Sequence, residues 1–215
     1  MAGKNWVWQR LAQGRVVGVI RTDQDPEVVL EAARAVTAGG INCIEVSFNT
    51  PQAHRIIEKL VQELPQAVVG AGTVLDAPTS RLAILAGAQY LVCPVLKEEV
   101  LNTANRYGVL AIPGIFTPSE ALRAWELGAL LVKVFPASIL GPTFIRSLRV
   151  PLPQLEFLPT GGITVDNAPE YIRAGALAVC VGSALFSHQT LQARDYTALE
   201  RKAREFVQAV QMAKT

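Results

Sequence analysis

One lysine lies inside an apolar segment of strand type, Leu130-Leu131-Val132-Lys133-Val134-Phe135-Pro136. Removing an ammonium group from water is costly unless it is paired, so a buried lysine tends to lose its proton. A neutral amine is a nucleophile that forms a Schiff base with a carbonyl compound. The segment alone also fits a lysine at a strand end that reaches water or pairs with a carboxylate. The other lysines lie in polar or helix-patterned surroundings typical of surface charges: Lys4, Lys59, Lys97, Lys202 and Lys214.

An acid occupies a similar position in an earlier apolar segment, Ile44-Glu45-Val46-Ser47. Burial and a neighbouring lysine can tune the pKa of such a carboxyl group, which suits a general acid and base. The alternative is a plain ion pair with a buried base. Glu156 is the only other acid in such a segment, and we expect it to be structural because it comes early in its strand, close to water.

Three glycine-containing segments follow predicted strands. Gly70-Ala71-Gly72-Thr73-Val74 would let the backbone approach a ligand, with a hydroxyl and an N–H group from Thr73. The loops Thr160-Gly161-Gly162 and Gly182-Ser183-Ala184 follow later strands. Backbone N–H groups, a helix N-terminus and the Ser183 hydroxyl would suit a phosphate there, although tight turns alone explain the same glycines.

Arg21 follows the first predicted strand and is a candidate ligand for a carboxylate or phosphate, unless it is an exposed surface arginine. The two histidines, His54 and His188, have no cysteine or acid cluster around them. A catalytic triad or a metal site is therefore not expected, and both histidines are predicted to lie on the surface.

Strand-like and helix-like segments alternate along the whole chain, which predicts a parallel sheet buried on both faces. Eight such units fit one closed (β/α)8 barrel over residues 1–215, with an extra N-terminal helix over 4–13 that packs through Trp6 and Leu11. An open doubly wound sheet is the alternative, but the first strand lacks its glycine-rich turn. The expected strands are 16–20, 43–48, 67–71, 90–93, 109–112, 130–135, 156–158 and 177–181. The later helices are expected over 78–86, 97–106, 118–127, 141–149, 166–174 and 195–213.

Bulk properties exclude several classes of protein. The chain has 215 residues, of which 50% are hydrophobic, and a formal net charge of +2 without a basic block. These values indicate a globular protein that binds neither nucleic acid nor an anionic membrane surface. The first residues carry no signal-peptide core, so we expect a cytoplasmic protein. The three cysteines are expected to be buried thiols: Cys43, Cys93 and Cys180.

An ordered set of motifs resembles the family of 2-keto-3-deoxy-6-phosphogluconate (KDPG) and 4-hydroxy-2-oxoglutarate (KHG) aldolases. The resemblance covers essentially the whole chain. It implies a class I aldolase without metal or cofactor on a (β/α)8 barrel, usually a homotrimer. The motifs are Ile44-Glu45-Val46, Gly70-Ala71-Gly72-Thr73-Val74, Cys93-Pro94, Ile112-Pro113-Gly114, Val132-Lys133-Val134-Phe135-Pro136-Ala137 and Pro159-Thr160-Gly161-Gly162-Ile163.

The resemblance also implies roles for individual residues. Lys133 would form the Schiff base, Glu45 would transfer protons, and Thr73 would bind the pyruvyl carboxylate. The phosphate site would comprise Gly161, Gly162 and Ser183, and the pocket around the substrate would comprise Pro94, Phe135 and Thr160.

One position departs from the family pattern, because many KDPG aldolases have an arginine where this chain has Asn49. Arg21 could take over its role with the carboxylate, as in related 2-keto-3-deoxy-6-phosphogalactonate aldolases, whereas Thr160 favours the gluconate-type enzyme. The expected reaction is cleavage of KDPG to pyruvate and glyceraldehyde 3-phosphate. Cleavage of 4-hydroxy-2-oxoglutarate to pyruvate and glyoxylate is a second activity that the sequence leaves open. The alternatives are the galactonate-type aldolase, another barrel enzyme such as an isomerase, and a non-catalytic phosphosugar-binding barrel.

Overall fold

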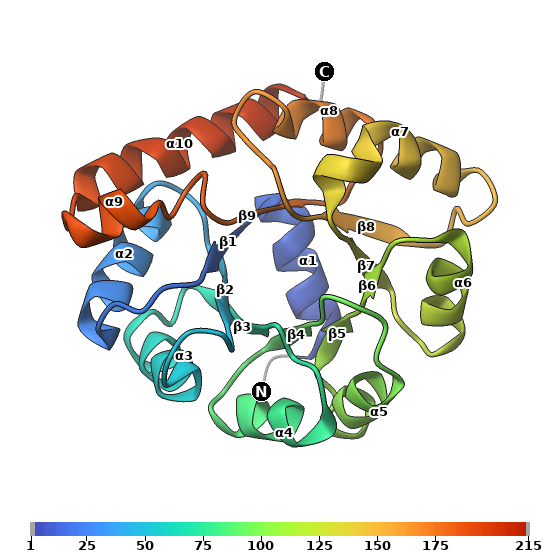
Figure 1. Cartoon of the computed structure of the whole chain (residues 1–215), viewed down its shortest axis with the longest axis horizontal. Coiled ribbons are helices and arrows are strands. Elements are labelled where there is room, and N and C mark those ends of the chain that lie inside the picture. The colour runs from blue at the N-terminus through green and yellow to red at the C-terminus, as the bar shows by residue number, and fades with distance from the viewer. Residues whose placement is uncertain (1–2, 214–215) are drawn as a thin grey trace.

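Parallel strands and helices alternate along the chain, in a computed structural model that describes residues 3–213. Lys214 lies outside the described residues. Figure 1 shows the strands in a ring, with most helices on its outside. Six strands form one sheet and three form a second. The strands are β1 (Val16–Ile20), β2 (Cys43–Ser47), β3 (Val68–Gly72), β4 (Tyr90–Val92), β5 (Leu110–Ile112), β6 (Gly114–Ile115), β7 (Leu131–Val134), β8 (Glu156–Pro159) and β9 (Val179–Val181).

The larger sheet has the strand order β5-β4-β3-β2-β1-β9, and the smaller sheet has the order β6-β7-β8. The boundary between β5 and β6, where one sheet ends and the other begins, has a local cause at Pro113. Proline has no N–H group to donate to a ladder, so β5 ends before Pro113 and a separate short strand, β6, follows it. The expected strand 109–112 corresponds to β5, and β6 was not predicted. β5 pairs with β4, while β6 pairs with β7, and the Pro113 carbonyl accepts a hydrogen bond from the Lys133 N–H at 2.8 Å. At the other boundary between the two sheets, where β8 meets β9, a single β-bridge joins Thr160 to Cys180. The prediction of a barrel is met in part: the sheets are parallel and curled, but the strands do not form one closed ladder.

The helices mostly lie where the sequence predicted them. They are α1 (Lys4–Gly14), α2 (Pro26–Ala38), α3 (Ala53–Glu63), α4 (Ala77–Leu85), α5 (Glu98–Tyr107), α6 (Pro118–Glu126), α7 (Ala137–Arg149), α8 (Ala168–Arg173), α9 (His188–Gln192) and α10 (Tyr196–Met212). Thr117 and Glu120 form a capping box with Pro118 in the first turn of α6, and Asp25 precedes Pro26 at the start of α2. The short α9 was not expected, and α7 begins four residues before the predicted start, with a kink at Gly141 (φ 69°).

Apolar side chains form two clusters, one between the strands and the outer helices and one inside the ring. The inner cluster joins Val7 and Leu11 of α1 to residues of the strands, so this helix packs against the interior. The prediction for Trp6 was wrong: its side chain is 42% exposed and stacks near the Arg10 guanidinium, because Val7 and Leu11 define the buried face.

Other predictions agree with the structure. The three cysteines are buried and free. Glu156 forms an ion pair with Arg149 at 3.4 Å, as expected for a structural acid. No helix within residues 3–213 has the length and apolar character needed to cross a membrane.

Candidate active site

A cavity of about 400 Å³ opens where the strands end. Ten of the eleven candidate residues line it, and they come from every part of the chain. Asn49 is the exception, since its side chain is exposed and lies behind Ser47. The ten lining residues are Arg21, Glu45, Thr73, Pro94, Lys133, Phe135, Thr160, Gly161, Gly162 and Ser183.

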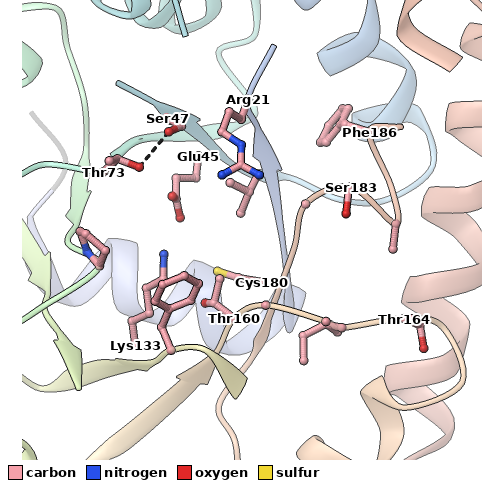
Figure 2. A pocket seen from close by; sticks show the side chains of 18 residues that line it. Arg21, Glu45, Ser47, Thr73, Lys133, Thr160, Thr164, Cys180, Ser183 and Phe186 are labelled. Carbon is pink, nitrogen blue, oxygen red and sulfur yellow. Dashed lines mark hydrogen bonds between the residues drawn. The ribbon is translucent and has the colours of Figure 1, made fainter. Parts of the chain in front are cut away.

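Lys133 and Glu45 enter this cavity from β7 and β2 and point toward one another (Figure 2). Lys133 is 6% exposed, so it does not reach bulk water as a strand-end lysine would. Among residues 3–213, no carboxylate forms an ion pair with it. Its Nζ atom lies 5.0 Å from the centroid of the Phe135 ring, which provides an aromatic face beside the amine.

Glu45 is 1% exposed, and its Oε2 atom has no hydrogen-bond partner among the described residues. Burial raises the pKa of this carboxyl group, and the positive charge of Lys133 opposes that increase in part. The carboxylate fits against β3 because position 72 is a glycine, where a Cβ atom would overlap Oε1. A buried carboxyl group with a raised pKa beside an amine can accept and return a proton during a reaction.

The hydroxyl of Thr73 lies on the cavity wall and is 2.8 Å from Ser47 Oγ, the contact drawn as a dashed line in Figure 2. Thr73 has a positive φ of 56°, which is unusual for a β-branched residue and aims the side chain away from the regular strand path. Arg21 points into the same side of the pocket. Together these groups could hold an anion such as a carboxylate.

Two glycine-containing loops form the other end of the cavity. Gly161 and Gly162 have positive φ values of 95° and 74°, and a Cβ atom on Gly162 would lie 2.7 Å from Cβ of Ser138. The amide of Asn167 donates a hydrogen bond of 2.8 Å to the Gly162 carbonyl. Ser183 contributes its hydroxyl from the loop after β9. This combination of backbone and hydroxyl donors suits an anion.

Gly182 and Ala184 line the cavity beside Ser183, in the loop that the sequence predicted for an anion. Sequence reasoning missed six further lining residues: Val19, Ser47, Ile163, Thr164, Cys180 and Phe186. Ser47 could have been found, because it stands two residues after Glu45 and side chains alternate along a strand. Cys180 was recognised only as a buried thiol. Burial raises its pKa, which makes it a weak nucleophile beside Lys133. No group of three or more metal-ligating side chains occurs within the described part of the chain.

The comparisons with known proteins agree on one family. A family profile described as "KDPG and KHG aldolase" matches residues 7–202. The chain is 36% identical over 205 residues to 2-dehydro-3-deoxy-phosphogluconate aldolase of Treponema pallidum (strain Nichols), covering 95% of this chain and 97% of that protein. It is 34% identical over 163 residues to 2-dehydro-3-deoxy-6-phosphogalactonate aldolase of Escherichia coli (strain K12), covering 75% and 80%.

A solved structure shows the same arrangement of the chain. It is the KDPG aldolase from Legionella pneumophila with pyruvate captured as a covalent carbinolamine intermediate. The two match with a TM-score of 0.86 and 28% identity, over 92% of this chain and 96% of the other. The profile spans most of the sequence, and the relatives match over most of their own length. The chain therefore belongs to the KDPG and KHG aldolase family, a family of carbon–carbon lyases.

Proposed function

We propose that this protein is a class I aldolase that cleaves a 2-keto-3-deoxy-6-phospho sugar acid to pyruvate and glyceraldehyde 3-phosphate. The observation that carries the proposal is the pair of buried, facing side chains, Lys133 and Glu45, in one cavity. Schiff-base aldol chemistry requires an amine as the nucleophile and a second group that transfers protons, and these two side chains supply both. The two sheets would together correspond to the (β/α)8 barrel of this family.

The reaction begins with attack of the neutral Lys133 amine on the C2 keto group. The carbinolamine loses water to give an iminium ion, which withdraws electrons from the C3–C4 bond. Glu45, directly or through a water molecule, takes the proton of the C4 hydroxyl group as that bond breaks, and the aldehyde leaves. The same carboxyl group then protonates C3 of the enamine, and hydrolysis of the new iminium releases pyruvate and restores the lysine.

The remaining lining residues would orient the substrate. Arg21 and Thr73 would hold the carboxylate at one end of the cavity. Gly161, Gly162 and Ser183 would hold the phosphate at the other. Pro94, Phe135 and Thr160 would line the carbon chain between these ends. Two ends with anion-binding groups, separated by a reactive amine, match a substrate with a carboxylate, a central ketone and a phosphate.

Trapping with borohydride tests the nucleophile. Treatment with pyruvate and borohydride should reduce the iminium and attach the three-carbon unit to wild-type protein, with the modified peptide containing Lys133. The Lys133→Ala variant should gain no adduct and lose several orders of magnitude in turnover. Lys59→Ala, which removes a surface lysine paired with Glu27, serves as the control and should behave as wild type. An adduct on Lys133→Ala would show that the nucleophile is another residue, and no adduct on the wild type would exclude a class I aldolase.

The substrate could instead be the galactonate epimer. Two features favour this second candidate. Arg21 lines the cavity, whereas position 49 carries an asparagine that does not line it. A relative of that specificity is among the matching proteins. Initial rates with both epimers and with 4-hydroxy-2-oxoglutarate would rank the three substrates. Adduct formation with pyruvate but no turnover of any of them would point to a non-catalytic binding barrel.

The family resemblance also leads us to propose a homotrimer. Large apolar side chains stand exposed on α7 and just after it, with Ile139 71% and Val150 81% exposed. Burial of such side chains between copies would remove apolar surface from water. Light scattering coupled to size-exclusion chromatography would give the mass of the assembly directly, and a monomer would contradict the proposal.

A further inference from the structure

Three polar groups converge on one buried hydroxyl group in the cavity wall, that of Ser47. The Oγ atom of Ser47 lies 2.8 Å from Oγ1 of Thr73, 3.2 Å from Oδ1 of Asn49 and 3.4 Å from the backbone nitrogen of Asn49. Ser47 is only 2% exposed and, like Thr73, lines the cavity. The side chains of Asn49, Ser47 and Thr73 therefore form a chain of hydrogen bonds that runs from the protein surface to the cavity.

The number of protons on this chain restricts what Thr73 can offer to a ligand. A serine or threonine hydroxyl donates one hydrogen bond and can accept two. When Ser47 donates to the Asn49 side-chain oxygen, its bond with Thr73 must be donated by Thr73. The Thr73 hydroxyl then presents only lone pairs to the cavity, which repel a carboxylate.

The opposite direction of the chain frees the Thr73 proton. When Ser47 donates to Thr73 instead, the Thr73 hydroxyl can donate to an anion in the cavity. Ser47 still accepts a hydrogen bond from the Asn49 backbone N–H. When the Asn49 amide turns its NH2 group toward Ser47, with almost no change in shape, the serine has no acceptor at position 49 and its proton goes to Thr73. An amide at position 49 thus permits both directions of the chain, and the anion-binding direction is favoured when its NH2 group, rather than its oxygen, faces Ser47.

We propose that Asn49 and Ser47 are positioning residues that set the direction of this hydrogen-bond chain and thereby enable Thr73 to donate to the substrate carboxylate. This inference rests on the proposed function, in which Thr73 holds that carboxylate. The backbone supports the assignment, because Thr73 keeps an unfavourable positive φ of 56° that fixes its hydroxyl between Ser47 and the cavity. Asn49 acts here without lining the cavity.

The decisive substitution is Asn49→Asp, which keeps the shape of the side chain but only accepts hydrogen bonds. It holds Ser47 as a donor toward position 49, so Thr73 must donate to Ser47. We expect the half-saturating pyruvate concentration for borohydride trapping to rise about tenfold, the loss typical of one hydrogen bond to a charged group. The KM of the cleavage reaction should rise in parallel, with kcat little changed. Thr73→Val, which removes the donor itself, sets the largest loss that this mechanism allows.

The double variant Ser47→Ala/Asn49→Asp separates this mechanism from simple charge repulsion. Ser47→Ala alone removes the hydroxyl through which position 49 acts, and its affinity for pyruvate is the reference for the double variant. The double variant should bind pyruvate as tightly as Ser47→Ala does, because the introduced carboxylate no longer has a serine hydroxyl through which to act. If Asn49→Asp costs the same tenfold in the Ser47→Ala background as in wild type, repulsion between carboxylates explains the loss and the inference is wrong. Wild-type affinity in Asn49→Asp itself would also overturn it.

The same measurements separate a failure of this inference from a failure of the proposed function. If wild-type protein forms an adduct with pyruvate but the variants contradict the expected pattern, only the proposed roles of Asn49 and Ser47 are wrong. If wild-type protein forms no adduct, the proposed function fails and the inference falls with it.

Discussion

The carboxylate of Glu45 lies directly against the backbone of Gly72 on the neighbouring strand β3. A Cβ atom at position 72 would overlap Oε1, and the ring of Tyr90 occupies the corresponding space beside Gly70. The register of the two strands places Glu45 opposite Gly70, and its side chain extends toward Gly72. Gly72 thus creates the space that the buried acid occupies, while Gly70 leaves room for the ring of Tyr90.

Replacement of Gly72 by alanine should displace this carboxylate without changing any polar group. We expect turnover to fall about 100-fold, the typical effect of moving a reacting group by about 1 Å. Trapping of pyruvate on Lys133 should persist, because the amine is on another strand. Gly14→Ala is a matched control, since its Cβ atom would meet Cys43 Sγ at an ordinary 3.9 Å. Wild-type turnover in Gly72→Ala would mean that Glu45 does not react from this position.

The pH dependence of cleavage should contain a step from Glu45. Burial raises the pKa of this carboxyl group above its ordinary value of 4.5, although the nearby charge of Lys133 opposes the increase. Cys93, Tyr90 and Cys180 are the other titratable groups that sense its charge. Cleavage needs the carboxylate as a base, so kcat should fall as pH decreases through the raised pKa. Glu45→Gln should lose this step and about 10²- to 10⁴-fold in kcat, and turnover at the wild-type rate would remove Glu45 from the mechanism.

The same raised pKa predicts the effect of pH on folding. Between pH 4.5 and the pKa in the folded state, the folded protein holds a proton on Glu45 that the unfolded chain has lost. The free energy of unfolding therefore decreases as pH rises through this window, because the buried group must become charged. Glu45→Gln removes this penalty and should be more stable than wild type above the window, but not below its lower limit. Urea unfolding of both proteins across this pH range measures the difference, and a constant difference would contradict the burial argument.

Ser183 should act only on phosphorylated substrates. In Ser183→Ala, KM for the 6-phospho sugar acid should rise about tenfold, because a hydrogen bond to a charged group is lost. The smaller substrate 4-hydroxy-2-oxoglutarate has no phosphate, so its KM should stay the same. Ser119→Ala, an exposed serine on α6, is the control for the substitution itself. An equal increase of KM for both substrates would place Ser183 elsewhere than at the phosphate.

Local signals in the sequence predicted most elements of the fold. The helix expected over 118–127 is α6, which begins with a capping box formed by Thr117 and Glu120 within four residues. Short apolar runs followed by glycine-containing loops marked the strands. The exceptions arise where another part of the molecule decides. The short strand β6, which follows Pro113, was not predicted, because it is defined by its pairing with β7 rather than by an apolar run of its own. The buried face of α1 depends on what packs against the helix. The sequence pattern placed Trp6 on that face, but Val7 and Leu11 form it.

The sequence by itself determined the chemistry available to this protein: one lysine and one acid in strands that must be buried, and glycine loops after later strands. Their positions at strand ends followed from the alternation of strands and helices. Only the tertiary structure decided that Lys133 and Glu45 face each other, that Ser47 reaches Thr73, and that Asn49 stands behind the cavity wall. These relationships depend on strand register and on the curvature of the sheets, which arise from packing of the whole chain and leave no local mark in the sequence.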